Sequence, residues 1–377
     1  MPVPDPGPDP SAAGRNTLLR CLAIAPAAEE TLRLRLELLR PDLWEALFEA
    51  AQAARLTAPL AARIAERGLA PPRPRRLEEG AMAPADVLAA FAAQHAARRE
   101  AQRQALLHVV GLLNAGGFEP ILLKGARSLW LGAEPERSMR DFDLLLPGAA
   151  AKAANDLLKA QGFAPLPGAP ERPNRHHLDL LFRDDMPGWI EIHRRGGNPY
   201  ADPFLPTRQI AAISRRETRQ GAHAFVLPAA AHSWHGLIHH HFGHSGFARG
   251  TVDLKGLYEF CCAYQLMPQA GRATVRRLAA SNATGLAALD LWLALGRDLL
   301  ALPLDAEPQP DACAASVAVA ARLFGEAAGL RYAGYRETIR LAWSPGRLAE
   351  TGARGWTGGL SARTRAALRL LPKIRRE

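Results

Sequence analysis

The chain has 377 residues, of which 48% are hydrophobic, so it is large and apolar enough to form two or three packed units and is not a disordered protein. Its formal net charge of +10 favours an anionic partner such as a nucleotide, a polyphosphate or a nucleic acid, although no interleaved pattern of aromatic and basic residues indicates RNA binding. The four cysteines lack CxxC spacing, and the N-terminus lacks the features of a secretion signal. No apolar run reaches the roughly 18 residues that a membrane span needs. We therefore expect a cytoplasmic protein without a membrane span.

The first part of the chain is expected to lead into a helical region. Residues 1–27 begin with many prolines, aspartates and glycines, which disfavour helix and strand, and are predicted to be a disordered lead-in. Residues 28–116 are predicted to be helical, because leucines recur at three- and four-residue spacing, with a break at Pro41. A long helix is expected from about Pro84 to Asn114, because two glycines follow at Gly116 and the next position.

The pattern then changes from helical to mixed. Residues 117–228 are predicted to form the core of the protein, because short apolar stretches replace the alanine-rich pattern. Strands are expected at 119–123, 141–146, 177–182, 189–193 and 223–227, and helices around 126–131 and 149–161. This order indicates an α/β (α+β) fold, in which helices pack on a small mixed sheet. Residues 229–377 are expected to be helical, with a loop around 303–311 and a basic tail from Ser361 to Arg376.

Two aspartates in the second predicted strand provide the clearest chemical signal. Asp141 and Asp143 are two residues apart, so a strand points both side chains to one face, with their Cα atoms roughly 7 Å apart. Two such carboxylates can hold a divalent metal ion. Phosphoryl and nucleotidyl transfer need a cation between carboxylates and phosphate oxygens, because the negative charge around phosphorus repels a nucleophile.

A turn before this strand carries groups that suit phosphate. Lys124 and Gly125 follow a short apolar strand, where glycine lets the backbone approach phosphate and lysine supplies positive charge. Arg137 and Arg140, just before the aspartates, can reinforce this charge. We therefore assign these four residues to nucleotide binding.

A later strand offers a third carboxylate. Glu191 and His193 alternate with isoleucines and share one face. Glu191 on an adjacent strand would complete a site for two Mg²⁺ ions, one activating the attacking hydroxyl and the other holding the triphosphate. His193 is placed with the binding residues, because it can order Glu191 or contact the acceptor, and a structural role is the alternative.

These segments carry a family resemblance. Leu123–Gly125, Arg137–Leu146 and Ile190–His193 resemble the uncharacterised nucleotidyltransferase family within the DNA polymerase beta superfamily. In that superfamily a glycine-containing turn precedes an Asp-x-Asp strand, and a third acidic residue comes from a later strand. Further segments similar to the family are Pro41–Trp44, His232–His244 and Thr251–Leu254.

The resemblance implies a role for each matched residue. It implies that Asp141 and Asp143 are metal ligands, that Glu191 is the third carboxylate, and that Lys124 with Gly125 is the nucleotide-binding turn. This chain departs from the more common Gly-Ser or Gly-Gly turn of the superfamily, so contact through a serine hydroxyl is not carried over. Lys124 replaces that contact electrostatically in this interpretation.

The sequence therefore predicts a Mg²⁺-dependent nucleotidyltransferase. It would move a nucleoside monophosphate from a nucleoside triphosphate, such as ATP, to an acceptor hydroxyl and release pyrophosphate. The acceptor could be a small molecule, a sugar, a peptide, a protein or RNA. One alternative is a non-catalytic nucleotide-binding or adaptor protein that retains the fold.

A second alternative is a zinc-dependent hydrolase built on a histidine-rich segment. On a helix, His235 and His239, and likewise His240 and His244, have the i and i+4 spacing that suits a shared metal ion. The zinc-protease pattern requires a glutamate directly after the first histidine, and Gly236 stands there. A histidine-rich helical face near the active cleft is therefore the preferred interpretation.

Overall fold

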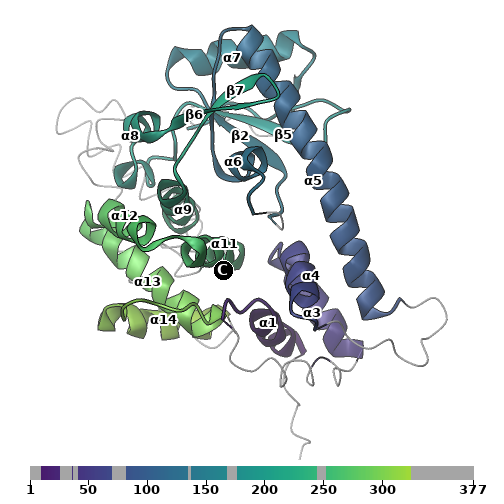
Figure 1. The fold of residues 1–377 in the computed structure, drawn as a ribbon, viewed down its shortest axis with the longest axis vertical. Helices are drawn as coiled ribbons and strands as arrows, with labels where there is room; N and C mark the ends of the chain where they lie inside the picture. Colours follow the sequence, from purple (N-terminus) through teal and green to yellow (C-terminus); the bar gives the residue numbers. More distant parts are fainter. Residues whose placement is uncertain are drawn as a thin grey trace, which may run out of the picture.

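The computed structural model contains a mixed sheet with helices packed against it and helical groups on two sides (Figure 1). The residues that it describes are 10–25, 36, 41–69, 82–134, 137–167, 176–243 and 252–323. The predicted fold class is confirmed. Among the described helices, none combines the length and the apolar character needed to cross a membrane.

In the described part of the N-terminal region, three helices form a group: α1 (Pro10–Cys21), α3 (Pro41–Ala53) and α4 (Thr57–Glu66). Helix α1 packs mainly on α3, and α4 contacts both of them. Leu47 and Leu60, from α3 and α4, are fully buried in a core that also includes residues of the C-terminal helices. The expected helical character of this region is confirmed for these segments.

Helix α1 corrects the expectation of a disordered lead-in over 1–27. Leu18, Cys21 and Leu22 are fully buried, because their three- and four-residue spacing places them on one face of the helix, against the core. Proline is compatible with the first turn, where Pro10 stands. The expectation is wrong for Pro10–Cys21, and residues 1–9 and 26–27 lie outside the described residues.

Helix α5 (Pro84–Ala115) joins the N-terminal helices to the sheet and confirms the predicted long helix. Leu88, near its start, belongs to the core of the N-terminal helices. Val109 and Leu113, near its end, belong to a second core, which lies on one face of the sheet. The helix ends before Gly117, whose φ of +81° lies in the left-handed region that glycine adopts readily. In Figure 1, α5 runs along the whole side of the molecule.

Among the described residues, the sheet has seven strands in the order β3-β4-β5-β2-β1-β7-β6. The strands are β1 (Ile121–Leu122), β2 (Asp141–Leu145), β3 (Ala164–Pro165), β4 (Leu181–Phe182), β5 (Trp189–His193), β6 (Arg215–Arg219) and β7 (Ala222–Val226). The pairs β2–β5 and β1–β7 are parallel, and the other neighbouring pairs are antiparallel. Each of the five predicted strand regions contains a strand, whereas β3 and β6 were not predicted.

Helices α5, α6 (Lys124–Leu131) and α7 (Ala149–Ala160) contribute to the apolar core on one face of the sheet. Phe142 and Ile190, from β2 and β5, point into this core and are fully buried. Helix α6 begins two residues earlier than predicted, so Lys124 and Gly125 are its first residues and do not form a separate turn.

The C-terminal helices confirm the helical expectation for the described part of that region. After α8 (Thr207–Ile213), the helices are α9 (Ala229–Ile238), α11 (Leu254–Leu266), α12 (Gln269–Ala280), α13 (Ala283–Leu300) and α14 (Pro310–Leu323). A π-helical turn, His239–Gly243, extends α9. Trp234 and Trp292 are fully buried between these helices. The predicted basic tail from Ser361 to Arg376 lies outside the described residues.

The apolar face of β2 provides a stability test. Replacing Phe142 with alanine removes a fully buried ring from the core beneath the sheet, so Phe142→Ala should lower the free energy of unfolding by about 3–5 kcal/mol. Urea denaturation measures this change. The control Leu266→Ala removes a side chain that is 84% exposed and should change stability by less than about 0.5 kcal/mol. Equal effects of the two substitutions would contradict the described packing of β2.

Candidate active site

Parallel pairing of β2 and β5 brings the predicted acidic residues together. Asp143 lies directly beside Glu191, and Leu145 beside His193, in the register of the two strands. Because side chains alternate along a strand, the carboxylates and the imidazole share the sheet face opposite the Phe142 core. Residues nearly fifty positions apart in the sequence therefore become neighbours.

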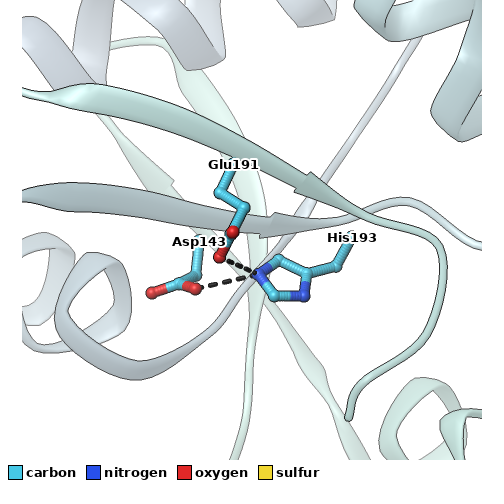
Figure 2. A group of neighbouring side chains, drawn as sticks. All are labelled: Asp143, Glu191 and His193. Carbon is cyan, nitrogen blue, oxygen red and sulfur yellow. Dashed lines mark hydrogen bonds and ion pairs between the residues drawn. The ribbon is translucent and has the colours of Figure 1, made fainter. Parts of the chain in front are cut away.

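His193 connects the two carboxylates (Figure 2). Its Nε2 lies 2.8 Å from Asp143 Oδ1 and 3.0 Å from Glu191 Oε2. On the other side, His177 Nδ1 lies 3.2 Å from Glu191 Oε1. Burial lowers the pKa of His193, but its hydrogen bonds to Asp143 and Glu191 raise it above the usual value overall. His193 therefore orders both acidic side chains, and His177 orders Glu191.

Lys124 supplies a second positive charge to the same carboxylate. Its Nζ lies 2.7 Å from Asp143 Oδ1. The φ of Lys124 is +45°, a left-handed backbone conformation that is strained for a residue other than glycine. Burial disfavours the charged lysine, but Asp143, Glu191 and Asp141 raise its pKa above the usual value. The site therefore holds a strained, charged lysine against its most buried aspartate.

The two aspartates of β2 differ in their electrostatic surroundings. Burial raises the pKa of Asp143, but Lys124 and the hydrogen bond from His193 lower it below its usual value overall. Burial, followed by the negative charge of Asp143, raises the pKa of Asp141 to about 6. Among the described residues, Asp141 thus has no cation close enough to offset its surroundings, whereas Asp143 has two.

The cluster has a donor set that a divalent metal ion can use. One potential ligand atom from each of Asp143, Glu191 and His193 lies within 4.8 Å of the others, and all three residues are buried. Asp141 lies outside this group but lines the same cleft, on the same face of β2. Oxygen ligands suit Mg²⁺, and the poorly neutralised Asp141 carboxylate is consistent with a site that a cation completes.

Asp141, Asp143 and Glu191 line a cleft of about 710 Å³, whereas His193 does not line it. The strands β2 and β5 and the start of α6 form one wall. The other described lining residues come from α3, α4 and the turn between them, from α5, from the segments before β2 and β4, from the π-helical turn and from the start of α11. The acidic cluster therefore faces a space that could hold a nucleotide-sized ligand.

Four of the residues assigned to binding line this cleft with different contacts, namely Lys124, Gly125, Arg137 and Arg140, whereas His193, which was placed with them, does not line it. A Cβ on Gly125 would lie 3.1 Å from the Met139 side chain, so the small residue allows close packing there. Arg137 forms ion pairs with Glu259, at 2.6 Å, and with Glu134, at 3.4 Å, and links the β2 segment to α11. Arg140 is exposed.

Two contacts of the site were missed by the sequence analysis. His177 could have been suggested by its place at the start of the predicted strand at 177–182, beside another histidine. Glu259, which binds Arg137, had no such signal, because it comes from a helix far along the chain.

The histidine-rich segment does not form a zinc site from its described members. His235 is buried with a ring nitrogen 2.6 Å from the Gly196 carbonyl oxygen, and His241 accepts a hydrogen bond from Trp292 at 3.2 Å. His240 pairs with Asp253 at 2.8 Å. Within the described part of the chain, no metal-ligand group of three includes these histidines, and His244 lies outside it.

Comparison with known proteins agrees with this geometry. The model of a family described as uncharacterised nucleotidyltransferase matches residues 40–295, about two thirds of the chain. No curated protein and no solved structure matches the chain. The matched range includes every described residue that lines the cleft.

The Lys124–Asp143 pair provides a test of the electrostatics. Lys124→Met removes a cation from an aspartate that is 2% exposed, so the free energy of unfolding should fall by about 3 kcal/mol. Urea denaturation at neutral pH with a chelator measures it. The control Lys152→Met breaks an exposed i,i+4 pair with Asp156 and should cost less than about 0.5 kcal/mol. If both variants were equally stable, Lys124 would not neutralise Asp143.

Proposed function

The chain belongs to the uncharacterised nucleotidyltransferase family, and on that premise we propose that it transfers a nucleoside monophosphate from a nucleoside triphosphate to an acceptor hydroxyl. The observation that carries this proposal is the register of β2 and β5, which places Asp143 beside Glu191 on the cleft side of the sheet. Asp141 shares that face and gives the cleft a third carboxylate.

Two Mg²⁺ ions are the cofactor that we propose for this site. Asp141 and Asp143 would hold both ions, and Glu191 would hold the one nearer the acceptor. When bound, these ions would supply positive charge between the carboxylates and the phosphate oxygens and would make the attacking hydroxyl more acidic. The grouping of Asp143 and Glu191, and the raised pKa of Asp141, support this assignment.

The residues of the chain have separate roles in the proposed reaction. The acceptor oxygen bonds to the α-phosphorus, the bond between the α-phosphorus and the oxygen leading to the β-phosphate breaks, and pyrophosphate leaves. Glu191 receives the hydroxyl proton. Lys124 neutralises the leaving phosphates, and Gly125 lets the start of α6 approach them. His193 and His177 hold Glu191 in place through the contacts described above.

The four cysteines are free thiols, which supports a reducing, cytoplasmic location for this activity.

The remaining alternative is a protein that binds nucleotides without transferring them. The two differ in pyrophosphate release, which binding alone does not produce.

Asp143→Asn tests the proposed site. Asparagine keeps the volume of the side chain but removes its negative charge, so we expect at least tenfold weaker binding of nucleoside triphosphates with Mg²⁺ and roughly 100-fold less pyrophosphate release. Calorimetry with each of the four common triphosphates measures binding, and a coupled assay over a panel of hydroxyl acceptors measures release. Circular dichroism establishes that the variant is folded.

Asp184→Asn serves as the control, because Asp184 is exposed and does not line the cleft. This variant should behave as the unaltered protein. Unchanged binding and release by Asp143→Asn would refute the proposed site. Binding without release by the unaltered protein, across the whole panel, would favour the non-catalytic alternative.

A further inference from the structure

Two cations of the cleft lack an acidic partner among the described residues. Six arginine and lysine residues line the cleft. Four form ion pairs: Lys124 with Asp143, Arg137 and Lys255 with Glu259, and Arg55 with Asp253. The other two, Arg98 of α5 and Arg140 before β2, are exposed and have no carboxylate partner in the described part of the chain. Their positive charge is available to a ligand.

Arg98 and Arg140 also line a second pocket, of about 550 Å³, that adjoins the cleft. The rest of its described lining consists of Met186, Pro187, Gly188 and Trp189, with no acidic residue. The pocket therefore combines two guanidinium groups with the apolar surface of a half-buried tryptophan. Arginine binds phosphate and carboxylate groups through paired hydrogen bonds, and an indole packs well against an apolar segment.

The rim of this pocket is held in place by buried contacts. Gln102 of α5 is 3% exposed, and its Nε2 lies 3.2 Å from the carbonyl oxygens of both Met139 and Pro187. The Trp189 amide donates a hydrogen bond to the Arg140 carbonyl oxygen at 3.0 Å. The segments that carry Arg140 and Trp189 are thus tied to each other and to α5. A ligand would meet a prearranged surface.

Trp189 of the pocket and Lys124 lie on opposite sides of β2. Strand β2 stands between β5 and β1 in the sheet. Lys124 follows β1, whereas Trp189 begins β5, the strand that also carries Glu191. An in-line displacement requires the nucleophile and the leaving group to be on opposite sides of the phosphorus. If Lys124 holds the leaving phosphates, the acceptor must come from the side of β5, where Glu191 can take its proton.

We propose that this pocket binds the acceptor, and that the acceptor carries an anionic group, a phosphate or a carboxylate, in addition to its hydroxyl. Arg98 and Arg140 bind the anionic group, and Trp189 packs against the neighbouring part of the acceptor. This inference rests on the proposed nucleotidyl transfer. It also changes the role of Arg140, which the sequence analysis assigned to nucleotide binding and which here recognises the acceptor.

The test uses the full chain saturated with Mg²⁺ and the α,β-methylene analogue of whichever triphosphate binds most tightly. Inorganic phosphate and succinate are then titrated as probes and followed by calorimetry. We expect the unaltered protein to bind at least one of them, and the better probe indicates a phosphate or a carboxylate acceptor. Arg98→Gln and Arg140→Gln should each weaken that binding roughly tenfold, because each removes a charged hydrogen-bond donor.

The nucleotide analogue provides the second readout. Its affinity should change less than about twofold in Arg98→Gln and Arg140→Gln. The matched control is Arg103→Gln, on the same helix, because Arg103 pairs with Glu100 and lines neither pocket. This control should leave both anion and nucleotide binding unchanged.

Three results would overturn the acceptor pocket. The first is no binding of either anion to the unaltered protein, and the second is anion binding by both variants that is as tight as that of the unaltered protein. The third is weakened nucleotide binding in the variants, which would assign the arginines to the nucleotide. Failure of the proposed function has a different signature. In that case no nucleotide analogue binds, or Asp143→Asn leaves its binding unchanged, whatever the anions do.

Discussion

The parallel pairing of β2 with β5 is the constraint on which the rest of the site depends. Along β2, Phe142 and Leu144 enter the core, while Asp141 and Asp143 face the cleft. A slip of one residue would exchange the two faces and bury carboxylates among apolar side chains. The apolar face therefore fixes the register, and the register places Asp143 beside Glu191. Burial of two adjacent carboxylates is unfavourable unless cations accompany them, and Lys124 and His193 meet that requirement.

The cleft depends on segments from much of the chain, and helix α5 keeps them in place. Its first part packs in the same core as the N-terminal and C-terminal helices, and its second part packs beneath the sheet. A second connection is the ion pair between Arg137, which precedes β2, and Glu259 of α11. The sheet supplies the acidic residues, and these two connections hold the other walls against it. The family match spans the described segments that form all of these walls.

Sequence patterns predicted the elements whose signals are local. The alternation of apolar and acidic residues indicated β2 and β5, and proline and glycine marked the ends of α5. Strand β6 (Arg215–Arg219) was missed because it is polar and forms by pairing with β7 and not by burial. The prediction of a disordered lead-in was wrong for α1. The proline-rich start of the chain disfavoured a helix, whereas Leu18 and Leu22 pack against distant helices, which no local pattern indicates. The Arg137–Glu259 pair is a tertiary contact, so no local pattern encodes it.

Helix α5 also sets a limit on how the chain can vary in length. Arg98 and Gln102 are four residues apart, so they lie on the same face of the helix, one turn from each other. Gln102 is anchored to the carbonyl oxygens of Met139 and Pro187. One residue inserted between Arg98 and Gln102 would rotate Arg98 by about 100° away from the pocket. Relatives with the same pocket should therefore accept insertions before α5, in the loops, while the spacing between these two residues stays constant.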